Sequence, residues 1–211
     1  MKTIVLIIIA YLLGSIPSGF WIGKAFYKKD IRQFGSGNTG TTNTFRVLGV
    51  KAGFAVFLAD LLKGTLATSL AYLPNIEVNP LWFGLCAILG HVFPIFAKFK
   101  GGKAVATSAG MLLGYHPLFF FYSLAIFLIL LYITSMVSLS SMIAAVIITL
   151  STFILPFILP ALLPEQDWLL SCIAVIVTVF IFYLHRQNIQ RLRQGTESRI
   201  SFGLNKKPKE K

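Results

Sequence analysis

The sequence has few charged residues of either sign and very few acidic ones. Of its 211 residues, 12% are Asp, Glu, Lys or Arg, and only 7 are acidic. About a quarter of the residues of an average soluble domain are charged, so a soluble globule of this size is excluded. With 56% hydrophobic residues and a mean hydropathy of +0.78, the composition predicts a polytopic membrane protein.

Cysteine is almost as scarce, and neither cysteine has a polar neighbourhood. Cys86 and Cys172 both fall within apolar segments, where a free cysteine behaves as a small hydrophobic residue. The sequence also lacks a cluster of residues with metal-ligand spacing. We therefore expect no metal and no cofactor.

The net charge of +12 comes from basic residues that flank the apolar segments. Such residues orient membrane spans and contact anionic lipid headgroups, and these two effects explain the charge without nucleic acid. Membrane lipids are accordingly the expected partners, and no nucleic acid is expected.

Six apolar segments have a length close to the ~17 to 25 residues that a spanning helix needs. They lie near residues 3–23, 51–73, 81–97, 117–134, 138–160 and 167–185. Residues 103–116 form a shorter apolar segment, roughly 21 Å of helix against a hydrocarbon core of ~30 Å. Because Pro117 disfavours a continuous helix at His116, this segment is either a seventh short span or half of one broken helix over 103–134.

The distribution of charge favours seven spans. Of the 19 Lys and Arg residues, six lie in residues 24–51, three in residues 98–103 and eight after His185, whereas the connections 74–80 and 161–167 have none. Under the positive-inside rule all three basic clusters are cytoplasmic, which six spans cannot achieve. We predict an all-α fold of seven transmembrane helices, with the N-terminus outside and the C-terminus cytoplasmic.

We further predict one membrane domain over residues 1–204 and a basic, disordered cytoplasmic tail over 205–211. The first apolar run leads directly into a basic segment, which favours an uncleaved first span over a cleaved signal.

Three short polar segments lie between the apolar ones. The first is GSGNTGTTNTFR (residues 35–46), the second KFKGGKAVAT (98–107) and the third HRQNIQRLRQGTE (185–197). Each combines glycines or side-chain amides with fixed cations, a combination typical of phosphate binding. If all three lie on one membrane face, they can form one site.

The glycines of the first polar segment permit positive φ angles, which turn successive N–H groups toward an anion. Thr41 or Thr42 can cap a helix that begins the second span, and Arg46 supplies a bidentate cation about one turn later. The alternative is an ordinary flexible turn, since glycine-rich turns are common.

The second polar segment contains Gly101-Gly102-Lys103 but not the GxxxxGK[ST] pattern, because Ala104 stands where a hydroxyl residue is needed. A nucleotide triphosphatase is therefore excluded. Two glycines and a lysine at the start of a short helix still place N–H groups, a positive dipole end and an ammonium together. The alternative is a basic flank that stops membrane transfer. Upstream, His91 is expected to hydrogen-bond a neighbouring helix.

The third polar segment places His185 and Asn188 three residues apart, on one helix face. A histidine there acts as a general base or donates hydrogen bonds to phosphate. Within the second span, Asp60 and Lys63 are also three residues apart and can neutralise each other. Residues 135–141 are predicted to be an inner loop rich in hydroxyls, from which Ser138 is a weaker candidate for the site.

The tracts GSGNTGTTNTFR, GHVFPIFAKFKGGKAVAT and HRQNIQRLRQGTE resemble, in order and spacing, the three motifs of the PlsY family, the bacterial acyl-phosphate:glycerol-3-phosphate acyltransferases. The resemblance covers the whole chain, including GSIPSGF in the first span and LADLLKG in the second. Departures are small, such as Thr39 where many relatives have proline.

The resemblance implies an enzyme of the bacterial inner (plasma) membrane with its active site on the cytoplasmic side. It would move an acyl group from acyl phosphate to the sn-1 hydroxyl of glycerol 3-phosphate, giving lysophosphatidate and phosphate. By the matching motifs, Ser36, Arg46 and Lys103 would contact phosphates, and His185 and Asn188 would orient glycerol 3-phosphate. The N–H groups of Gly37, Gly101 and Gly102 would bind the same anions. Asn38, Thr41 and Asn43 would shape the first loop, and Ser138 is a weaker candidate.

The sequence has neither a nucleophile elbow nor the HxxxxD pair of the soluble-type glycerol phosphate acyltransferases. Direct attack by the glycerol hydroxyl is therefore expected, with His185 or a substrate phosphate oxygen as the proton acceptor. Two other classes are a transporter of phosphorylated metabolites and a lipid-binding scaffold. A transporter needs polar groups reaching both faces or an inverted repeat, and a scaffold does not explain Asn38, Asn43 and Asn188.

Overall fold

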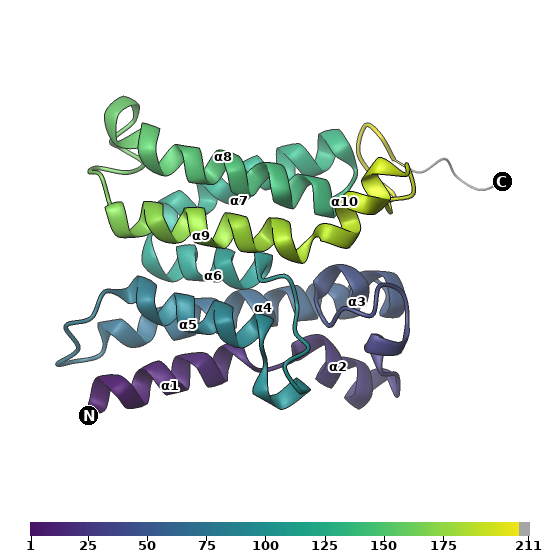
Figure 1. The fold of residues 1–211 in the computed structure, drawn as a ribbon, viewed down its shortest axis with the longest axis horizontal. Helices are drawn as coiled ribbons and strands as arrows, with labels where there is room; N and C mark the ends of the chain where they lie inside the picture. The colour runs from purple at the N-terminus through teal and green to yellow at the C-terminus, as the bar shows by residue number, and fades with distance from the viewer. Residues whose placement is uncertain (207–211) are drawn as a thin grey trace. The chain divides into compact units, whose positions relative to one another are not determined.

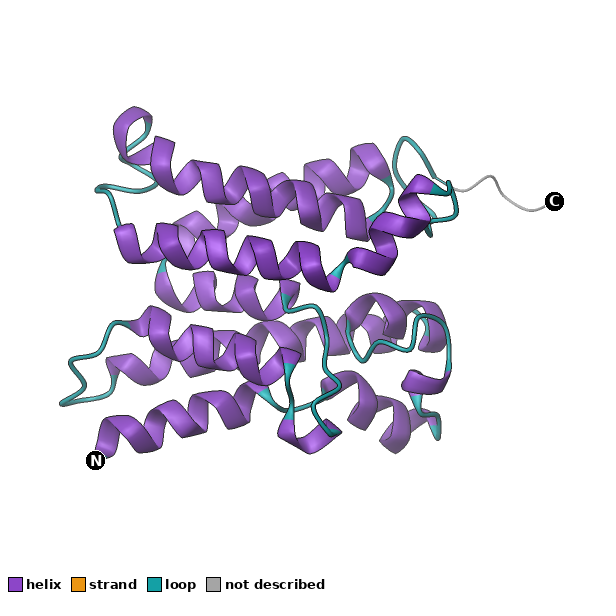
Figure 2. Ribbon diagram, in the orientation of Figure 1, coloured by secondary structure: helices purple, strands orange, loops and turns teal. Residues whose placement is uncertain are grey.

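The computed structural model describes residues 1–206, and within that range the protein is built from helices and loops without a strand (Figure 2). The chain divides into two compact units, Met1–Pro117 and a second unit that begins at Leu118. The all-helical class predicted from the sequence is confirmed for the described residues.

The first unit contains six α-helices (Figure 1). They are α1 (Lys2–Gly14), α2 (Ser18–Tyr27), α3 (Thr41–Leu48), α4 (Val50–Ser69), α5 (Pro80–Val92) and α6 (Val105–Tyr115), with short 3₁₀ turns at Ile31–Gln33, Leu70–Tyr72 and Ile95–Ala97. Helix α4 is central, because it packs against α1, α3, α5 and α6. Between α4 and α6 the backbones approach closely at Gly64 and Gly110, where an added Cβ would meet the backbone of the other helix.

The second unit contains α7 (Pro117–Thr134), α8 (Val137–Ile158), α9 (Trp168–Leu184) and α10 (Arg186–Arg193). Helices α8 and α9 pack against each other and share hydrogen bonds through Thr149 and Thr178, whose hydroxyls are 2.8 Å apart. After α10 the chain folds back on the α7–α8 turn, where the N–H of Ile200 donates to the carbonyl of Ser135. Asn205 continues this contact, and residues 207–211 of the predicted tail lie outside the described residues.

Among residues 1–206, four helical stretches are long and apolar enough to cross a membrane, and the number rises to six if each of two bent helix pairs is one span. The four are Val50–Tyr72, Pro80–Ala97, Pro117–Thr134 and Val137–Ile158; the pairs are α1 with α2 and α9 with α10. These stretches correspond to the six apolar segments of the sequence. Helix α6 is apolar but shorter, and His116 separates it from α7.

The apolar run over residues 3–23 is not one straight helix. Helix α1 ends at Gly14, α2 begins at Ser18, and their axes differ by 49°. Pro17 lacks the N–H that a continuous helix needs at this point, so the backbone must leave helical geometry before it.

The predicted inner loop over residues 135–141 is wrong, because α8 begins at Val137 and only two residues separate it from α7. The hydroxyls of Ser140 and Ser141 donate to the carbonyls of Met136 and Val137. A serine that bonds its own helix in this way needs no solvent. A run of hydroxyl residues therefore does not distinguish a loop from a membrane helix.

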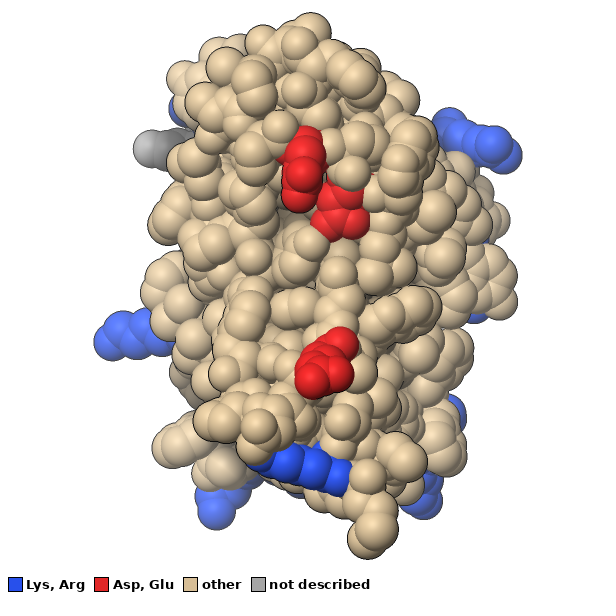
Figure 3. All heavy atoms as spheres, turned by 90° about the vertical axis from the view of Figure 1, so that its left-hand side faces the viewer, with Lys and Arg blue, Asp and Glu red and all other residues tan. Residues whose placement is uncertain are grey.

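In the view of Figure 3, most of the visible side chains are uncharged, and only a few are acidic. Large apolar side chains are freely exposed, for example Phe26 at 79% and Phe157 at 77%. Exposed apolar side chains of this size are expected of surface that contacts lipid.

Candidate functional site

The first polar segment is organised around Asn43, a side chain of α3 that is only 2% exposed. Its Oδ1 accepts a hydrogen bond from the N–H of Ser36 at 2.9 Å. Its Nδ2 donates to three backbone carbonyls at 2.9 to 3.1 Å, those of Ile31, Phe34 and Asn38. One amide thus joins four points of the loop, which closes tightly over the start of α3.

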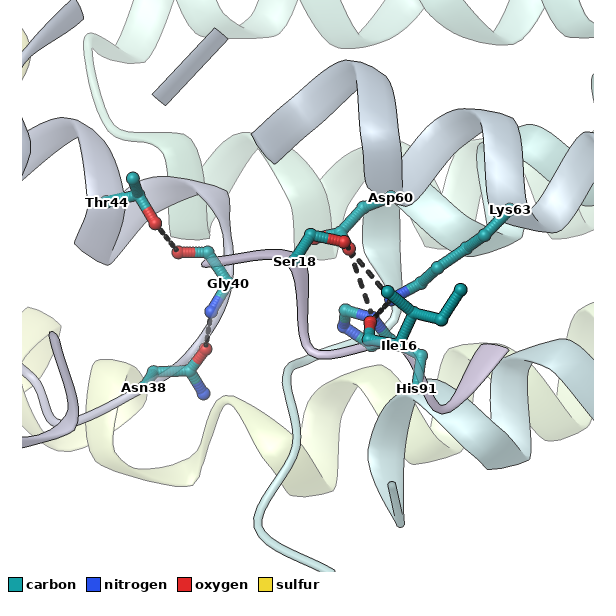
Figure 4. A network of polar contacts seen from close by, with 8 residues as sticks. All are labelled: Ile16, Ser18, Asn38, Gly40, Thr44, Asp60, Lys63 and His91. Atoms are coloured by element: carbon teal, nitrogen blue, oxygen red, sulfur yellow. Dashed lines mark hydrogen bonds and ion pairs between the residues drawn. The ribbon is translucent and has the colours of Figure 1, made fainter. Parts of the chain in front are cut away.

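The start of α3 is held by contacts of Gly40 and Asn38, and neither Thr41 nor Thr42 caps it. The N-terminal cap is Gly40, whose N–H donates to Oδ1 of Asn38 at 2.8 Å and whose carbonyl accepts from the Thr44 hydroxyl at 3.1 Å (Figure 4). The expectation that Thr41 or Thr42 caps this helix is therefore wrong. The Thr41 hydroxyl is buried and has no hydrogen-bond partner in the described part of the chain.

Two cationic side chains accompany this segment in different ways. Arg46 is exposed on α3, and its Cδ lies 3.4 Å from the position that a Cβ on Gly35 would occupy, so its stem runs beside the loop. Arg32 is instead paired with Asp30 at 2.7 Å and stacks over the ring of Phe20 at 4.1 Å. The hydrogen bond from Arg32 lowers the pKa of Asp30, so this pair is ionic at neutral pH.

The second polar segment is fixed against the end of α5. The N–H of Gly102 donates to the carbonyl of His91 at 3.1 Å, and a Cβ on Gly102 would collide with the His91 imidazole. Lys103 follows, Ala104 adopts a left-handed conformation (φ 62°), and α6 begins at Val105. The chain therefore places Lys103 immediately before a helix N-terminus, as the sequence predicts.

Two of the N–H groups that we expected to face an anion are already engaged. The N–H of Gly37 donates to the carbonyl of Phe34 at 3.1 Å, and that of Gly102 donates to His91. The sequence pattern identifies glycines but not the direction of their N–H groups. For Gly37 the requirement for glycine is instead its positive φ of 69°, and for Gly102 it is the close approach of the imidazole.

A buried polar cluster lies next to the two segments and consists of Ser18, Asp60, Lys63 and His91 (Figure 4). We call it the Asp60 cluster. Lys63 Nζ lies 2.8 Å from Asp60 Oδ1, which confirms the predicted neutralisation within α4. The Ser18 hydroxyl donates to the same carboxylate oxygen at 3.0 Å, and His91 Nδ1 lies 3.7 Å from it. Lys63 also donates to the carbonyl of Ile16 at 2.9 Å.

In the third polar segment, His185 lies at the break between α9 and α10, whose axes differ by 58°. Its side chain is 3% exposed, and Nδ1 lies 2.8 Å from the carbonyl of Ile181. A carbonyl accepts only, so Nδ1 carries a proton. In the neutral imidazole this leaves Nε2 as the nitrogen that accepts one.

Asn188, Ser138 and Arg191 all converge on Glu197. The distances to its carboxylate are 2.8 Å from Asn188 Nδ2, 2.8 Å from the Ser138 hydroxyl and 2.7 Å from Arg191 Nε. Burial by itself raises the pKa of Glu197, but the hydrogen bonds from Asn188, Arg191 and Ser138 outweigh it, and the net pKa lies below its ordinary value. Glu197 is thus an ionised carboxylate that fixes the Asn188 amide.

Glu197 is not among the site residues predicted from the sequence. The available signal is that Glu197 is the one acidic residue between His185 and Asn205, a stretch with four arginines. A single acidic residue among several basic ones indicates a specific ion pair, because a basic segment that is only solvated does not need an acidic residue.

The structure brings the first and second polar segments together around one cluster in the first unit. The third segment, with His185 and Asn188, belongs to the second unit, as does Ser138. Its convergence with the other two stays a prediction. Among residues 1–206, no group of three or more His, Cys, Asp or Glu side chains is arranged to hold a metal ion. The chemistry that these segments can perform is anion binding, hydrogen bonding and proton transfer.

The chain is similar in sequence to known glycerol-3-phosphate acyltransferases. Residues 4–195 match the family described as glycerol-3-phosphate acyltransferase. A glycerol-3-phosphate acyltransferase of Enterococcus faecalis is 70% identical over 208 residues, which is 98% of this chain and 96% of the relative. One of Streptococcus sanguinis is 54% identical over 206 residues, covering 97% of this chain and 95% of the relative.

Two crystal structures of PlsY, an integral membrane glycerol 3-phosphate acyltransferase, have a similar fold at 35% identity. The glycerol 3-phosphate form matches with a TM-score of 0.84 and the lysophosphatidic acid form with 0.81. Each comparison covers 95% of this chain and 96% of the crystal structure's chain.

Proposed function

The chain belongs to the PlsY family of integral membrane glycerol-3-phosphate acyltransferases, and from this membership we propose that it acylates the sn-1 hydroxyl of glycerol 3-phosphate with acyl phosphate as the donor. The products are lysophosphatidate and inorganic phosphate. The observation that carries the proposal is that its fold matches PlsY both with glycerol 3-phosphate and with lysophosphatidic acid. These two molecules are an acceptor and its acylated product.

The donor follows from the number of anions that the proposed site must hold. Two cationic segments, one with Arg46 and one with Lys103, are suited to two phosphate-bearing reactants. Glycerol 3-phosphate supplies one phosphate and acyl phosphate the other. An acyl phosphate is also already activated, so that positioning and electrostatic stabilisation provide most of the rate.

The proposed reaction is a direct transfer. The sn-1 oxygen attacks the acyl carbonyl carbon, the bond from that carbon to the phosphate oxygen breaks, and phosphate leaves with the electron pair. The hydroxyl proton goes to Nε2 of His185 or to a phosphate oxygen. Because Nδ1 of His185 points at a carbonyl, Nε2 is the nitrogen in the correct protonation state to accept it.

The other residues bind and orient the substrates. Ser36, Arg46 and Lys103 are proposed to contact phosphate, and Asn188, held by Glu197, to orient glycerol 3-phosphate. Since the N–H groups of Gly37 and Gly102 are engaged within their loops, Gly101 is the remaining glycine N–H candidate. Asn38 and Asn43 hold the first loop by the bonds already described, Thr41 adds a buried hydroxyl, and Ser138 acts through Glu197.

The proposal includes a topology. Helix α6 spans the membrane in addition to the six stretches named above, so that one membrane domain has seven spans. The N-terminus is outside, and the C-terminus and the active site are on the cytoplasmic side of the bacterial plasma membrane. The basic clusters support this arrangement, because all three then face the cytoplasm. The same arrangement brings the three polar segments to one membrane surface.

A reconstitution experiment tests the reaction. Purified protein in vesicles is given acyl phosphate and labelled glycerol 3-phosphate, and labelled lysophosphatidate is measured for the wild type, for Lys103→Ala and for Lys29→Ala as an exposed lysine outside the three segments. We expect product with the wild type and the control but not with Lys103→Ala. Label protected inside vesicles without product would indicate a transporter. Product from acyl-CoA but not from acyl phosphate would refute the donor.

A labelling experiment tests the convergence on one face. Cys86 and Cys172 are first replaced by alanine, and single cysteines are introduced at Thr42, Lys100 and Gln190, which are exposed positions of the three segments. An impermeant thiol reagent should reach all three from the cytoplasmic side only. A cysteine at Glu77, in a connection predicted to be outside, is the opposite control. Labelling of any two of the three from opposite sides would refute the shared site.

A further inference from the structure

The Asp60 cluster is the most deeply buried group of ionisable side chains in the described part of the first unit. Its three ionisable members, Asp60, Lys63 and His91, and the fourth member, Ser18, are between 2% and 7% exposed. Asp60 and Lys63 lie in the middle of the apolar helix α4. Ionisable side chains at such depth are costly, and they are usually retained for a function. Neither side chain lies in one of the three polar segments.

Mutual neutralisation does not account for the cluster. Lys63 and Asp60 pair within one turn of α4, at 2.8 Å, and this pair is already neutral. The two groups nevertheless contact three partners outside α4. Asp60 accepts a hydrogen bond from the Ser18 hydroxyl, Lys63 donates one to the Ile16 carbonyl, and the His91 imidazole lies 3.7 Å from the Asp60 carboxylate. Two of these partners belong to the α1–α2 break, and the third belongs to the end of α5.

The first set of contacts fixes the break between α1 and α2 relative to α4. Ile16 lies between the two helices, and its carbonyl accepts from Lys63 Nζ at 2.9 Å and from the N–H of Ser18 at 3.0 Å. Ser18 then bonds Asp60. The next residue, Gly19, packs so closely on the carbonyl of Thr39 that an added Cβ would collide with it. The cluster thus holds α2 directly against the first polar segment.

The second set of contacts fixes the loop before α6. His91 faces Asp60 with its Nδ1, and its imidazole lies against Gly102, whose N–H donates to the His91 carbonyl at 3.1 Å. Gly101 packs closely on the carbonyls of His91 and Val92, where an added Cβ would collide with both. Asp60 is therefore connected to both polar segments: through Ser18 and Gly19 to Thr39 of the first, and through His91 to Gly102 of the second.

We propose that the Asp60 cluster is a positioning device for substrate phosphate, which holds the first and second polar segments at a fixed separation so that Arg46 and Lys103 address their anions together. Its members act through the loops, without touching substrate. The choice of glycerol 3-phosphate as the anion rests on the proposed function. Geometry of this kind affects affinity steeply, because hydrogen bonds and ion pairs to phosphate depend on sub-ångström placement.

The test replaces the ion pair by an apolar pair of similar volume. The double variant Asp60→Leu with Lys63→Met leaves no unpaired charge in the membrane, and such replacements are often neutral for folding. We expect it to bind glycerol 3-phosphate about tenfold more weakly or worse, which corresponds to the loss of one charge-assisted hydrogen bond. Ser151→Ala is the matched control, because it removes a buried 2.8 Å contact to Tyr122 in the second unit.

Binding of glycerol 3-phosphate is measured by calorimetry on detergent-purified protein, alongside KM and kcat in vesicles. Weaker binding with a higher KM in the folded double variant, and wild-type values in the control, support the positioning role. A folded double variant with the wild-type Kd would overturn it.

Should the double variant not fold, Ser18→Ala decides, since it keeps the ion pair and removes only the tie to α2. A roughly threefold weaker Kd supports the proposal, about half the free energy of a tenfold change, and an unchanged Kd overturns it. Calorimetry of glycerol 3-phosphate binding requires no acyl donor, so the result can be interpreted even if acyl phosphate is not the donor. If wild-type protein itself does not bind glycerol 3-phosphate, the proposed function fails instead.

Discussion

Replacement of Glu197 is the sharpest test of how the third polar segment is organised. The carboxylate accepts hydrogen bonds from Ser138, Asn188 and Arg191, each at 2.7 or 2.8 Å, and its side chain is 4% exposed. Glu197→Gln keeps the shape and removes the charge. Its amide retains one oxygen, which can still accept from Ser138 and Asn188, but it places an NH₂ group opposite Arg191 Nε.

The cost follows from these contacts. The variant loses one charge-assisted hydrogen bond, about 1.5 to 3 kcal/mol, and partial hydration of Arg191, which is 31% exposed, moderates the donor–donor contact. We expect Glu197→Gln to destabilise the second unit by about 2 kcal/mol. Glu197→Ala also leaves Ser138 and Asn188 buried without this acceptor, at about 1 to 3 kcal/mol each, so it should cost about 4 kcal/mol or more.

Glu197→Gln should also lower the activity of the protein that remains folded. The Asn188 amide is no longer fixed by a charge, and a misplaced orienting group lowers kcat/KM by about tenfold or more. Stability is measured as the rate of heat inactivation, and activity as formation of labelled lysophosphatidate. Glu165→Gln is the matched control, because Glu165 is an exposed glutamate in the α8–α9 connection.

The stabilisation of the fold by Glu197 should depend on pH in a definite direction. The pKa of Glu197 in the folded protein is below its ordinary value of 4.5, so the carboxylate stabilises the fold fully above that value. As the pH falls through the folded pKa, this contribution is lost. The stability difference between the wild type and Glu197→Gln should therefore be largest near neutral pH and shrink in acid. A difference that is absent at neutral pH, or one that grows in acid, would refute the reasoning.

Three further predictions concern the other polar segments. Asn43→Asp keeps the acceptor for the Ser36 N–H but loses the Nδ2 donor to three carbonyls, so it should destabilise the fold by about 1 to 3 kcal/mol. This loss should be seen as faster heat inactivation. Thr42→Ser, on the exposed side of α3, should leave the inactivation rate unchanged. Lys103→Ala and Arg46→Ala should each lower kcat/KM at least tenfold while the protein is still purified in folded form; loss of folded protein would assign them to structure instead. His185→Ala should reduce turnover by about 10² to 10⁴ if Nε2 accepts the proton, and appreciable residual turnover would assign that role to the substrate phosphate.

Hydropathy predicted where helices lie but not where they break. The segment 3–23 is apolar enough for one span, yet α1 and α2 are separate helices around Pro17. Composition averaged over a window is insensitive to one missing N–H, whereas the backbone is not. The same limitation explains residues 135–141, whose serines were expected in a loop and instead bond their own helix. Hydroxyl content does not determine backbone geometry.

For the candidate site, the sequence predicted the local relations and missed the distant ones. The pairing of Asp60 with Lys63 follows from helical spacing, and the structure confirms it. The contacts of Asp60 with Ser18, 42 residues away, and of Ser138 with Glu197, 59 residues away, have no signal in local spacing. They depend on which helices pack together, and one sequence does not carry that information.

A common physical requirement explains why polar side chains and helix breaks coincide in this protein. Within or beside a bilayer, a backbone carbonyl or N–H that leaves a helix has no water to bond and must find a protein partner. Lys63 serves the Ile16 carbonyl at the α1–α2 break, Asn43 serves three carbonyls before α3, and the His185 side chain serves Ile181 at the α9–α10 break.

Each of these side chains is therefore fixed by the backbone that it satisfies. A group held in this way loses little additional freedom when it meets a substrate, and such pre-organisation favours both binding and catalysis. In a chain with so few charged residues, the breaks are also where anions can be bound at least cost, since loops before helix N-termini already expose N–H groups there. The interruptions of the helices thus create the places where chemistry is possible.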